Sequence, residues 1–444
     1  MSEPLLNGSQ LVDLEQLRDW VVQQRWYASK SRTVSSIELV ENLALRDDPA
    51  LLLALVQTRF ATGTHELYQL LLEPGTFDAL AEPRQALELL RRIDACDEFE
   101  TAEGRFSFHH VDGTASLPDD VPARLMGVEQ SNSSVVFDER LVLKVFRKLE
   151  PGVNPELEIL RFLTRREYPN IAPLHGWYEY EGQALSTTLG VSQTFFADAT
   201  GGWELALEEI QFDADSFLER VRGLGAVTAG LHSVLASDAG DPAFSPEEPS
   251  QEALSLLTAT VDEDIERIFV RLPDDPRLAP IVGRGQDVRE RLAARAQVGG
   301  GGRVIRTHGD YHLGQTLYTP RGWVIIDFEG EPARPLPERR QKRSPLRDVA
   351  GMMRSFAYVA SAVEILRGGQ APADFEQRAR DVFLEQYLAN VESTLLPAGE
   401  NAILSLLSIF ELEKAIYELR YELDNRPDWV SIPVAGIIRL LEAA

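Results

Sequence analysis

A change in hydrophobic pattern near residue 200 constrains the fold of this chain most. Before it, short apolar runs between turns predict strands, interrupted by helical stretches at 11–27, 85–95 and 156–167. From Trp203 onward helical periodicity dominates, and only residues 303–332 return to strand-like segments. The pattern predicts an α+β protein with a small α+β segment, a β-rich lobe, and a large helical lobe that carries one β-hairpin.

The length of 444 residues is too great for one hydrophobic core and favours two or three domains. We predict an N-terminal β-rich subdomain at 1–90, a β-rich lobe at 91–200 and a mainly helical lobe at 201–444. In the first of these, the apolar runs ALLLALVQTRF and HELYQLLLEP flank the turn ATGT, which predicts a β-hairpin.

The composition restricts partners and compartment. With 44 basic and 70 acidic residues the net charge is −26, which disfavours non-specific contact with nucleic acid or anionic membranes. The single cysteine, Cys96, excludes an intrachain disulfide and fits a reducing compartment. The start MSEPLLNGSQ lacks the pattern of a secretory signal, and no stretch reaches about 18 consecutive apolar residues. We therefore expect a cytoplasmic protein with no nucleic-acid or membrane partner.

The strand-like part of the helical lobe contains a polar cluster, THGDYHLGQT. His308, Asp310 and His312 alternate, so on a strand they would face one side and could bind zinc. A zinc site usually recruits further His or Cys, and the other five histidines stand in no comparable motif. A metallohydrolase remains one alternative, with bound zinc as its signature.

The spacing around Asp310 also fits phosphoryl transfer. Gln315 follows Asp310 by five residues and Asp327 follows it by seventeen, close to the offsets of the catalytic Asp, metal-binding Asn and metal-binding Asp of protein kinases. Oxygen ligands of this kind suit Mg²⁺. We predict Asp310 as the catalytic base, Gln315 and Asp327 as Mg²⁺ ligands, and Glu329 as a ligand acting through a water.

The same mechanism needs a lysine on the phosphates of ATP, paired with a glutamate. Lys144 lies in the apolar run RLVLKVF, where an unpaired charge is costly. The next helix offers Glu156 and Glu158, and we predict Glu158 as the partner. No GxGxxG precedes this lysine, and the turn QSNSS stands in its place. We predict phosphate contacts from this turn, by Gln130, Ser131, Ser133 and Ser134.

Several segments resemble those of bacterial maltokinases, and the similarity runs from about residue 12 to 440. They are EQSNSSVVFD, LKVFRKLEPGVNPELE, HGDYHLGQTL, WVIIDFEGEP, SPLRDVAGMMRSF and FELEKAIYELRYELDNRPDWVSIP. HGDxHxxQ is shared by many small-molecule kinases, whereas EKAxYExxYE and RPDWxxIP are narrower. The resemblance implies a bilobal protein-kinase-like fold, similar to aminoglycoside phosphotransferases, with an N-terminal cap that begins near QQRWYASKSR.

The resemblance also implies an activity, its cofactors and a partner. Maltokinases phosphorylate maltose on its anomeric hydroxyl with ATP and Mg²⁺, on a route from trehalose to α-glucan, which suggests association with a trehalose-converting enzyme. The family roles repeat those predicted for Asp310, Gln315, Asp327 and Lys144. The family also implies that adenine contacts the connector at Gln193 and Phe195.

A helical segment near the C-terminus suits the sugar. Along residues 411–423 one stripe is apolar, and the opposite stripe contains two tyrosines with a lysine and a glutamate. A sugar offers apolar C–H faces and many hydroxyls to such side chains. We predict that the acceptor contacts these four residues together with Asp310 and His312. The four are Lys414, Tyr417, Glu418 and Tyr421.

Two further alternatives remain open. A kinase for glucosamine or another monosaccharide would keep the same motifs and change only the acceptor pocket. A non-catalytic kinase-like module that binds a sugar is disfavoured by the intact Lys144, Asp310, Gln315 and Asp327. Nucleotide preference, oligomeric state and the purpose of the cap do not follow from the sequence. The histidines outside the polar cluster are predicted to be surface or packing residues: His65, His109, His110, His175 and His232.

Overall fold

A computed structural model describes residues 12–118, 120–127, 131–183, 185–296 and 301–442, and every structural statement concerns these residues. The chain forms two compact units, each described as a body of its own. Unit 1 comprises Met1–Thr164 with Ala172–Ala197, and unit 2 comprises Arg165–Ile171 with Asp198–Ala444. The predicted subdomains 1–90 and 91–200 thus fall in one unit. The α+β class is confirmed.

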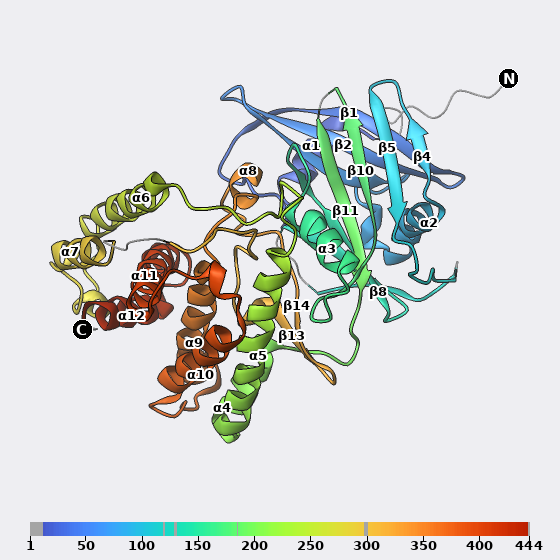
Figure 1. Ribbon diagram of the computed structural model, residues 1–444. Helices are drawn as coiled ribbons and strands as arrows, with labels where there is room; N and C mark the ends of the chain where they lie inside the picture. The colour runs from blue at the N-terminus through green and yellow to red at the C-terminus, as the bar shows by residue number, and fades with distance from the viewer. Residues whose placement is uncertain (1–11, 119, 128–130, 184, 297–300, 443–444) are drawn as a thin grey trace. The chain divides into compact units, whose positions relative to one another are not determined.

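The first sheet of unit 1 is antiparallel, in the order β1-β2-β3-β9 (Figure 1). The predicted hairpin is confirmed, with β2 (Ala50–Phe60) and β3 (His65–Leu72) joined at the turn ATGT. Strand β1 (Val34–Asp47) pairs with β2, and α1 (Leu14–Val21) packs beside them. A core of apolar and aromatic side chains fills this region, including Trp26, Tyr27 and Tyr68.

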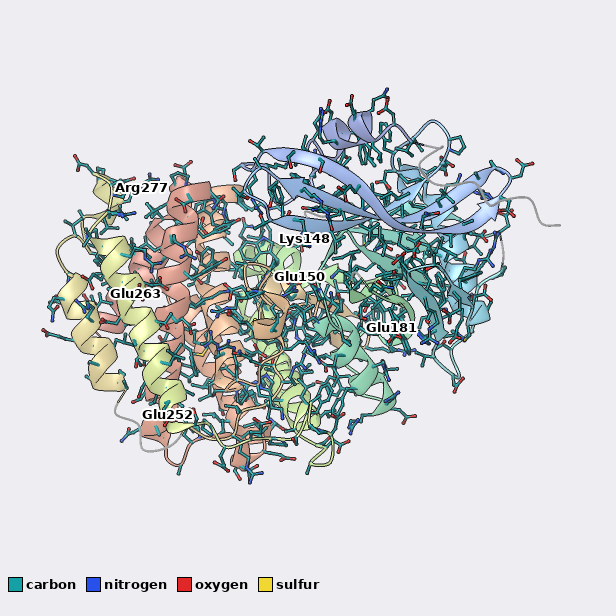
Figure 2. The ribbon with its side chains drawn as sticks, turned by 90° about the horizontal axis from the view of Figure 1, so that it is seen from above. Lys148, Glu150, Glu181, Glu252, Glu263 and Arg277 are labelled. Atoms are coloured by element: carbon teal, nitrogen blue, oxygen red, sulfur yellow. The ribbon has the colours of Figure 1, made fainter. Side chains whose placement is uncertain are left out.

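The fourth strand, β9 (Lys148–Leu149), joins this sheet to the rest of unit 1. Lys148, labelled in Figure 2, donates from Nζ to Glu66 Oε1 at 2.8 Å. The neighbouring Arg147 is 1% exposed, and its guanidinium donates to both carboxylate oxygens of Asp78, at 3.1 and 2.6 Å. A buried guanidinium held by two parallel hydrogen bonds is a strong and directional tie. It links the segments before and after residue 90 within unit 1.

The second sheet of unit 1 has seven strands, in the order β4-β5-β10-β11-β8-β7-β6. Helix α2 (Leu87–Ala95) packs against β5 and β10, and α3 (Pro155–Arg165) begins with the capping residue Asn154. The strands predicted around residues 124–146 and 173–195 are confirmed. The sheet comprises β4 (Glu98–Glu100), β5 (Gly104–His110), β6 (Ala123–Leu125), β7 (Asn132–Phe137), β8 (Leu141–Phe146), β10 (Leu174–Gly182) and β11 (Ser186–Thr194).

Unit 2 is mainly helical, as predicted, and carries a small sheet of order β12-β13-β14. Its hairpin consists of β13 (Thr316–Thr319) and β14 (Gly322–Ile325), and β12 (Thr200–Gly201) pairs with β13. The helices are α4 (Gly202–Phe212), α5 (Ala214–Leu235), α6 (Gln251–Phe269), α7 (Gly285–Arg295), α8 (Leu336–Arg339), α9 (Leu346–Arg367), α10 (Phe375–Asn390), α11 (Glu400–Asn425) and α12 (Ser431–Glu442).

Helix α9 lies at the centre of this helical unit and packs against α4, α10, α11 and α12. Among the described helices it is the one that is long and apolar enough to cross a membrane. Most of its apolar window is buried inside unit 2. The same length and composition are expected of a helix that forms the middle of a protein core.

Candidate active site

The polar cluster forms a loop that precedes β13, and its two histidines have different hydrogen-bond partners. His308 Nε2 lies 2.9 Å from the Ile326 carbonyl oxygen, next to Asp327, and the His308 ring packs between Tyr311 and Phe328. His312 Nδ1 instead accepts from the backbone N–H of Gly314 at 3.1 Å. His308 therefore joins two segments of the site, and the structure does not support the zinc alternative.

Asp348, at the start of α9, holds this loop in place. Its carboxylate accepts the backbone N–H groups of His308 and Gly309, at 2.7 and 3.0 Å, and lies 3.2 Å from His232 Nε2. Asp348 is buried, which alone would raise its pKa, but the contacts with His232 and the loop lower the pKa below its usual value. The other nitrogen of His232 lies 2.9 Å from the Tyr387 hydroxyl. Sequence reasoning missed this role of His232, because its partners come from two distant segments, α9 and α10.

Asp310 lies in the middle of this loop and pairs with a lysine from α11. Lys414 Nζ lies 3.2 Å from Asp310 Oδ1, and the two side chains are 31% and 21% exposed. Burial works against charge on Asp310, but Lys414 outweighs it and holds the pKa of the Asp310 carboxyl below its usual value. For the same reason the pKa of Lys414 is raised, despite its own burial. Asp310 is therefore an ionised carboxylate at neutral pH.

The two predicted Mg²⁺ ligands are neighbours in unit 2. Gln315 Nε2 donates to Asp327 Oδ2 at 2.8 Å. Asp327 has a φ of +65°, a backbone conformation that costs a non-glycine residue free energy and that concentrates at functional sites. An amide and a carboxylate placed side by side are hard oxygen donors, so this pair fits Mg²⁺. Glu329 follows in the same turn and is half-buried.

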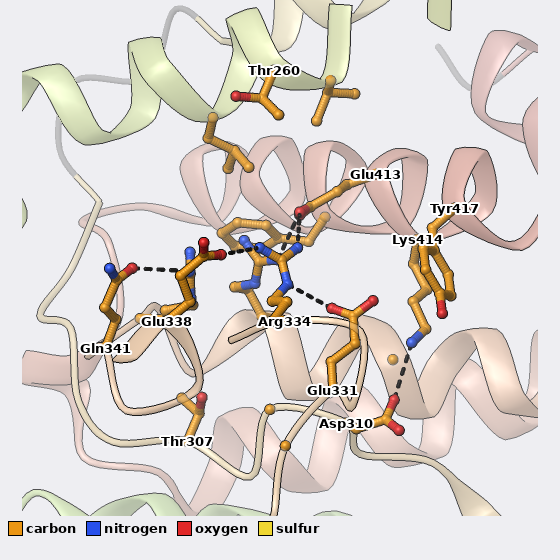
Figure 3. A pocket seen from close by; sticks show the side chains of 18 of the residues that line it. Thr260, Thr307, Asp310, Glu331, Arg334, Glu338, Gln341, Glu413, Lys414 and Tyr417 are labelled. Carbon is orange, nitrogen blue, oxygen red and sulfur yellow. Dashed lines mark hydrogen bonds and ion pairs between the residues drawn. The ribbon is translucent and has the colours of Figure 1, made fainter. Parts of the chain in front are cut away.

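A cavity of about 680 Å³ opens beside Asp310 within unit 2 (Figure 3). Its walls are α6, α11, the Asp310 loop and the segment around α8, and its lining alternates cations with carboxylates. Arg334 illustrates the pattern, since it pairs with Glu331 at 2.6 Å and with Glu413 at 3.5 Å. Burial, together with the nearby Arg347 and Arg334, lowers the pKa of Arg343 to about 10. The cavity thus offers many fixed hydrogen-bond donors and acceptors.

Helix α11 supplies part of the predicted acceptor group. Lys414 and Tyr417 line the cavity, and Figure 3 shows both beside Asp310. Among the described residues, Glu418 and Tyr421 are not part of the lining. Buried Arg354 donates from Nε and Nη2 to Glu418 Oε2, at 3.0 and 2.6 Å. Tyr421 is 41% exposed and stacks on Tyr417. The prediction is therefore wrong for Glu418 and Tyr421 as lining residues.

Further cavity residues were not identified from the sequence. Charged side chains on α11, on α9 and after Asp327 line the cavity without forming a recognisable motif. Their periodicity on α11 could have indicated a second polar face, but nothing local distinguishes it from a solvated surface. They are Glu331, Arg334, Arg343, Arg347, Glu413 and Arg420.

Unit 1 contains the predicted lysine pair, with a different glutamate. Lys144 Nζ donates to Glu156 Oε2 at 2.8 Å, and both side chains are buried. We therefore correct the predicted partner from Glu158 to Glu156. The reason is the phase of α3: Asn154 Oδ1 accepts from the Glu156 N–H at 2.8 Å and fixes the first turn, with Glu156 facing β8. Glu158 lies two residues on, about 200° around the helix, and is half-buried.

The other residues predicted to contact the nucleotide differ in their exposure and in their partners within unit 1. Ser131 is exposed, Ser134 is buried in β7 opposite Lys144, and the Ser133 hydroxyl accepts from Arg147 at 2.8 Å. The prediction for Gln130 lies outside the described residues. At the end of β11, Gln193 is buried and pairs with Val142, and the Phe195 ring lies under the guanidinium of Arg124.

The site and fold agree with two family matches. Residues 20–86 match the maltokinase N-terminal cap domain, and residues 123–330 match the phosphotransferase enzyme family. Over residues 123–330 the chain is similar to the phosphotransferase enzyme family, and it has the kinase-like fold of that family. With the cap, it is by class a sugar kinase.

Two curated relatives are glucosamine kinases. The protein from Streptacidiphilus jiangxiensis is 25% identical over 71% of this chain and 72% of its own length. The protein from Mycolicibacterium smegmatis (strain ATCC 700084 / mc(2)155) is 26% identical over 72% of this chain and 79% of its own length.

Solved structures have the same fold over nearly the whole chain. A glucosamine kinase in crystal form B superposes with a TM-score of 0.76 at 19% identity, covering 98% of this chain and 100% of the other. A glucosamine kinase in complex with glucosamine, ADP and inorganic phosphate gives a TM-score of 0.74 at 20% identity, covering 99% and 100%. At these identities the comparison establishes the shared fold alone.

Proposed function

We propose that this protein transfers a phosphoryl group from ATP, with Mg²⁺, to a hydroxyl of maltose. The observation that carries the proposal is the ionised Asp310 at the edge of a large cavity lined by charged side chains and Tyr417. Pockets for small molecules have volumes of about 300–1,000 Å³, and a cavity of about 680 Å³ exceeds the needs of one pyranose ring. The maltokinase-type cap supports a disaccharide acceptor as well.

In this proposal Asp310 is the catalytic base. Its carboxylate accepts a hydrogen bond from the sugar hydroxyl and orients it toward the γ-phosphorus. As the new O–P bond forms, the bond from phosphorus to the bridging oxygen breaks, ADP departs, and the hydroxyl proton passes to Asp310. Lys414 keeps Asp310 ionised before the transfer, and Tyr417 offers a ring face to the apolar side of the sugar.

The nucleotide is proposed to bind through Lys144, fixed by Glu156. The contact with Glu156 orients the Lys144 ammonium, so it can bind ATP phosphates without a large further loss of side-chain entropy. Gln315 and Asp327 would hold Mg²⁺, which neutralises charge on the phosphate oxygens when bound. Gln193 and Phe195 remain the proposed neighbours of adenine.

Glucosamine is the second candidate acceptor, because the two curated relatives described above are glucosamine kinases. Two features favour maltose over it: the volume of the cavity, and the segments EKAIYELRYE and RPDWVSIP of α11 and its C-terminal turn. Those segments carry Lys414 and Tyr417, which line the cavity. A cytoplasmic location and association with a trehalose-converting enzyme remain predictions.

An acceptor screen tests the proposal. The purified chain is incubated with Mg·ATP and maltose, glucosamine, glucose or trehalose, ADP release is measured, and the product is analysed by ³¹P NMR. We expect the highest kcat/KM for maltose, with phosphate on its anomeric hydroxyl. Faster phosphorylation of glucosamine would overturn the choice of acceptor. If none of the sugars stimulates ADP release, the proposed activity is overturned.

A further inference from the structure

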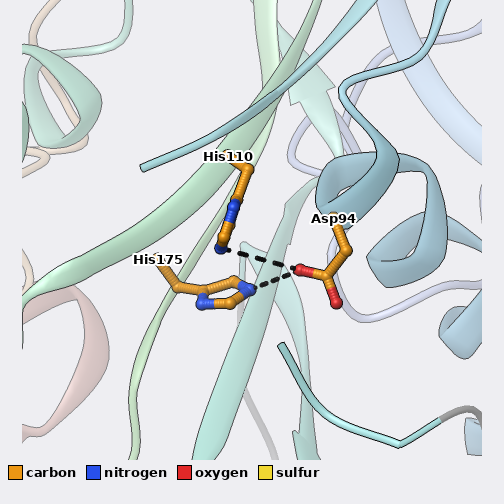
Figure 4. Close-up of side chains that lie close together, drawn as sticks. All are labelled: Asp94, His110 and His175. Carbon is orange, nitrogen blue, oxygen red and sulfur yellow. Dashed lines mark hydrogen bonds and ion pairs between the residues drawn. The ribbon is translucent and has the colours of Figure 1, made fainter. Parts of the chain in front are cut away.

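Three side chains of unit 1 that are distant in sequence meet around one point (Figure 4). Asp94 comes from the last turn of α2, His110 from the end of β5 and His175 from the start of β10. His175 Nε2 lies 2.8 Å from Asp94 Oδ1, and His110 Nε2 lies 4.0 Å from the same oxygen. One atom from each residue lies within 4.8 Å of the other two.

The close approach of α2 to the sheet creates this cluster. Gly176 follows His175 in β10, and a Cβ at this position would lie 2.3 Å from the Ile93 side chain. The absence of a side chain lets Ile93 pack onto the strand, and the next residue, Asp94, reaches His175. Strand pairing supplies the second histidine, because His110 of β5 pairs with Gly176.

The spacing of the ligand atoms suits a zinc ion. With metal–ligand bonds of about 2.0–2.1 Å, tetrahedral zinc holds its ligand atoms about 3.3 Å apart. The two measured separations from Asp94 Oδ1, 2.8 and 4.0 Å, lie on either side of that value. Shifts of roughly 0.5–0.7 Å would bring both contacts of Asp94 Oδ1 to the tetrahedral spacing.

The burial of the three side chains favours a bound metal ion at this point. The His175 side chain is 2% exposed, and those of Asp94 and His110 are each 17% exposed. Imidazole nitrogen suits zinc much better than Mg²⁺.

A threonine hydroxyl and a neighbouring cavity adjoin the three side chains. Thr114 Oγ1 lies 2.7 Å from His110 Nε2. Thr114 and His175 also line a cavity of about 380 Å³ within unit 1. An ion can thus enter from this cavity, and the fourth coordination position can hold water or the threonine hydroxyl.

We propose that Asp94, His110 and His175 bind one zinc ion that fastens α2 to strands β5 and β10. The site lies entirely in unit 1 and shares no residue with the proposed catalytic machinery. It supplies stability rather than chemistry, because the metal binds the folded arrangement and links three elements. The proposal does not depend on the identity of the acceptor sugar.

Calorimetric titration of the chelator-treated full chain with zinc chloride tests the proposal. We expect one zinc per chain, and in His110→Asn or Asp94→Asn an affinity weakened by more than the 10–100-fold that loss of an outer partner costs. His109→Asn is the matched control, because His109 neighbours His110 on β5 but bonds to Glu179 instead. Equal zinc affinity in the wild type, His110→Asn and Asp94→Asn would overturn the proposal, as would absence of binding to the wild type.

Cobalt and thermal unfolding supply readouts that do not rely on the heat of binding. Co²⁺ in this site is expected to give the visible absorption of a four-coordinate centre in the wild type and in His109→Asn, and to lose it in His110→Asn. Zinc at a hundredfold excess over its dissociation constant is expected to raise the Tm of unit 1 by roughly 5–10 °C. A Tm that zinc shifts equally in wild type and His110→Asn contradicts the proposal.

Discussion

Two ion pairs on helix α11 differ in their surroundings although they are one turn apart. Lys414 pairs with Asp310 beside the cavity, at 3.2 Å, and the two side chains are 31% and 21% exposed. Glu418 pairs with Arg354 in the core, at 2.6 Å, and there the side chains are 9% and 1% exposed. Lys414 therefore lies on the face of α11 that lines the cavity, together with Tyr417 and Arg420, whereas Glu418 lies on the face that packs in the core.

This difference determines what each pair can do. In the Arg354 pair, separation would leave a buried charge without a partner, so the pair is fixed and holds α9 against α11. In the Lys414 pair, a substrate hydroxyl can replace part of the contact, because the carboxylate faces the cavity. The same combination of residue types thus serves packing in one place and is poised for chemistry in the other.

The largest effect is expected for Asp310→Asn. The amide keeps the shape of the side chain but cannot accept the hydroxyl proton, so we expect kcat to fall by about 10²–10⁴-fold. Steady-state kinetics with Mg·ATP and the preferred sugar measure this loss, and the Tm should remain close to that of the wild type. Near-normal kcat would remove Asp310 from the chemistry.

The core pair is expected to respond in the opposite way. Glu418→Gln leaves Arg354 buried and unpaired, which should cost roughly 3–5 kcal/mol of unfolding free energy, measured by denaturant titration. The kinetic constants of the folded fraction should change little. Asp424→Asn, an exposed carboxylate on the same helix, is the control and should stay within about 0.5 kcal/mol. If Glu418→Gln keeps its stability and loses maltose kinetics, the core assignment is wrong.

A smaller effect should separate the two stacked tyrosines of α11. Tyr417 lines the cavity, so Tyr417→Ala should weaken kcat/KM for the sugar by the equivalent of roughly 1–3 kcal/mol and spare nucleotide binding. Tyr421→Ala removes only the ring behind it and should cost less. Kinetics at varied sugar concentration measure both, and a larger loss for Tyr421→Ala would contradict the geometry of the cavity.

Local patterns in the sequence predict the elements of this site better than its contacts. The offsets of Asp310, Gln315 and Asp327 are local, and the structure does bring Gln315 and Asp327 together. The choice between Glu156 and Glu158 depended on the phase of α3, which one capping contact sets. Periodicity predicted the polar stripe of α11. It did not predict that Glu418 is buried, because this burial depends on the packing of α9 against α11.

Contacts across distant segments could not be predicted in this way. His232 of α5 contacts Asp348 of α9, which lies 116 residues later in the sequence. Strand β5 was not predicted because its run GRFSFHH is short and ends in polar residues, so the meeting of His110 with His175 was hidden. Both clusters depend on packing that no local pattern encodes.

The pH dependence of kcat/KM tests the function of the Lys414–Asp310 pair most directly. Lys414 lowers the pKa of Asp310, so the wild type should lose activity only on the acidic side, when Asp310 takes up a proton. Lys414→Met removes the cation, raises the pKa of Asp310 and should move this acidic limb to higher pH. Arg420→Met, which removes another cavity cation of α11, should leave the limb where it is. An acidic limb that is unchanged in Lys414→Met, or that moves to lower pH, would contradict the assignment of Asp310 as a base tuned by Lys414.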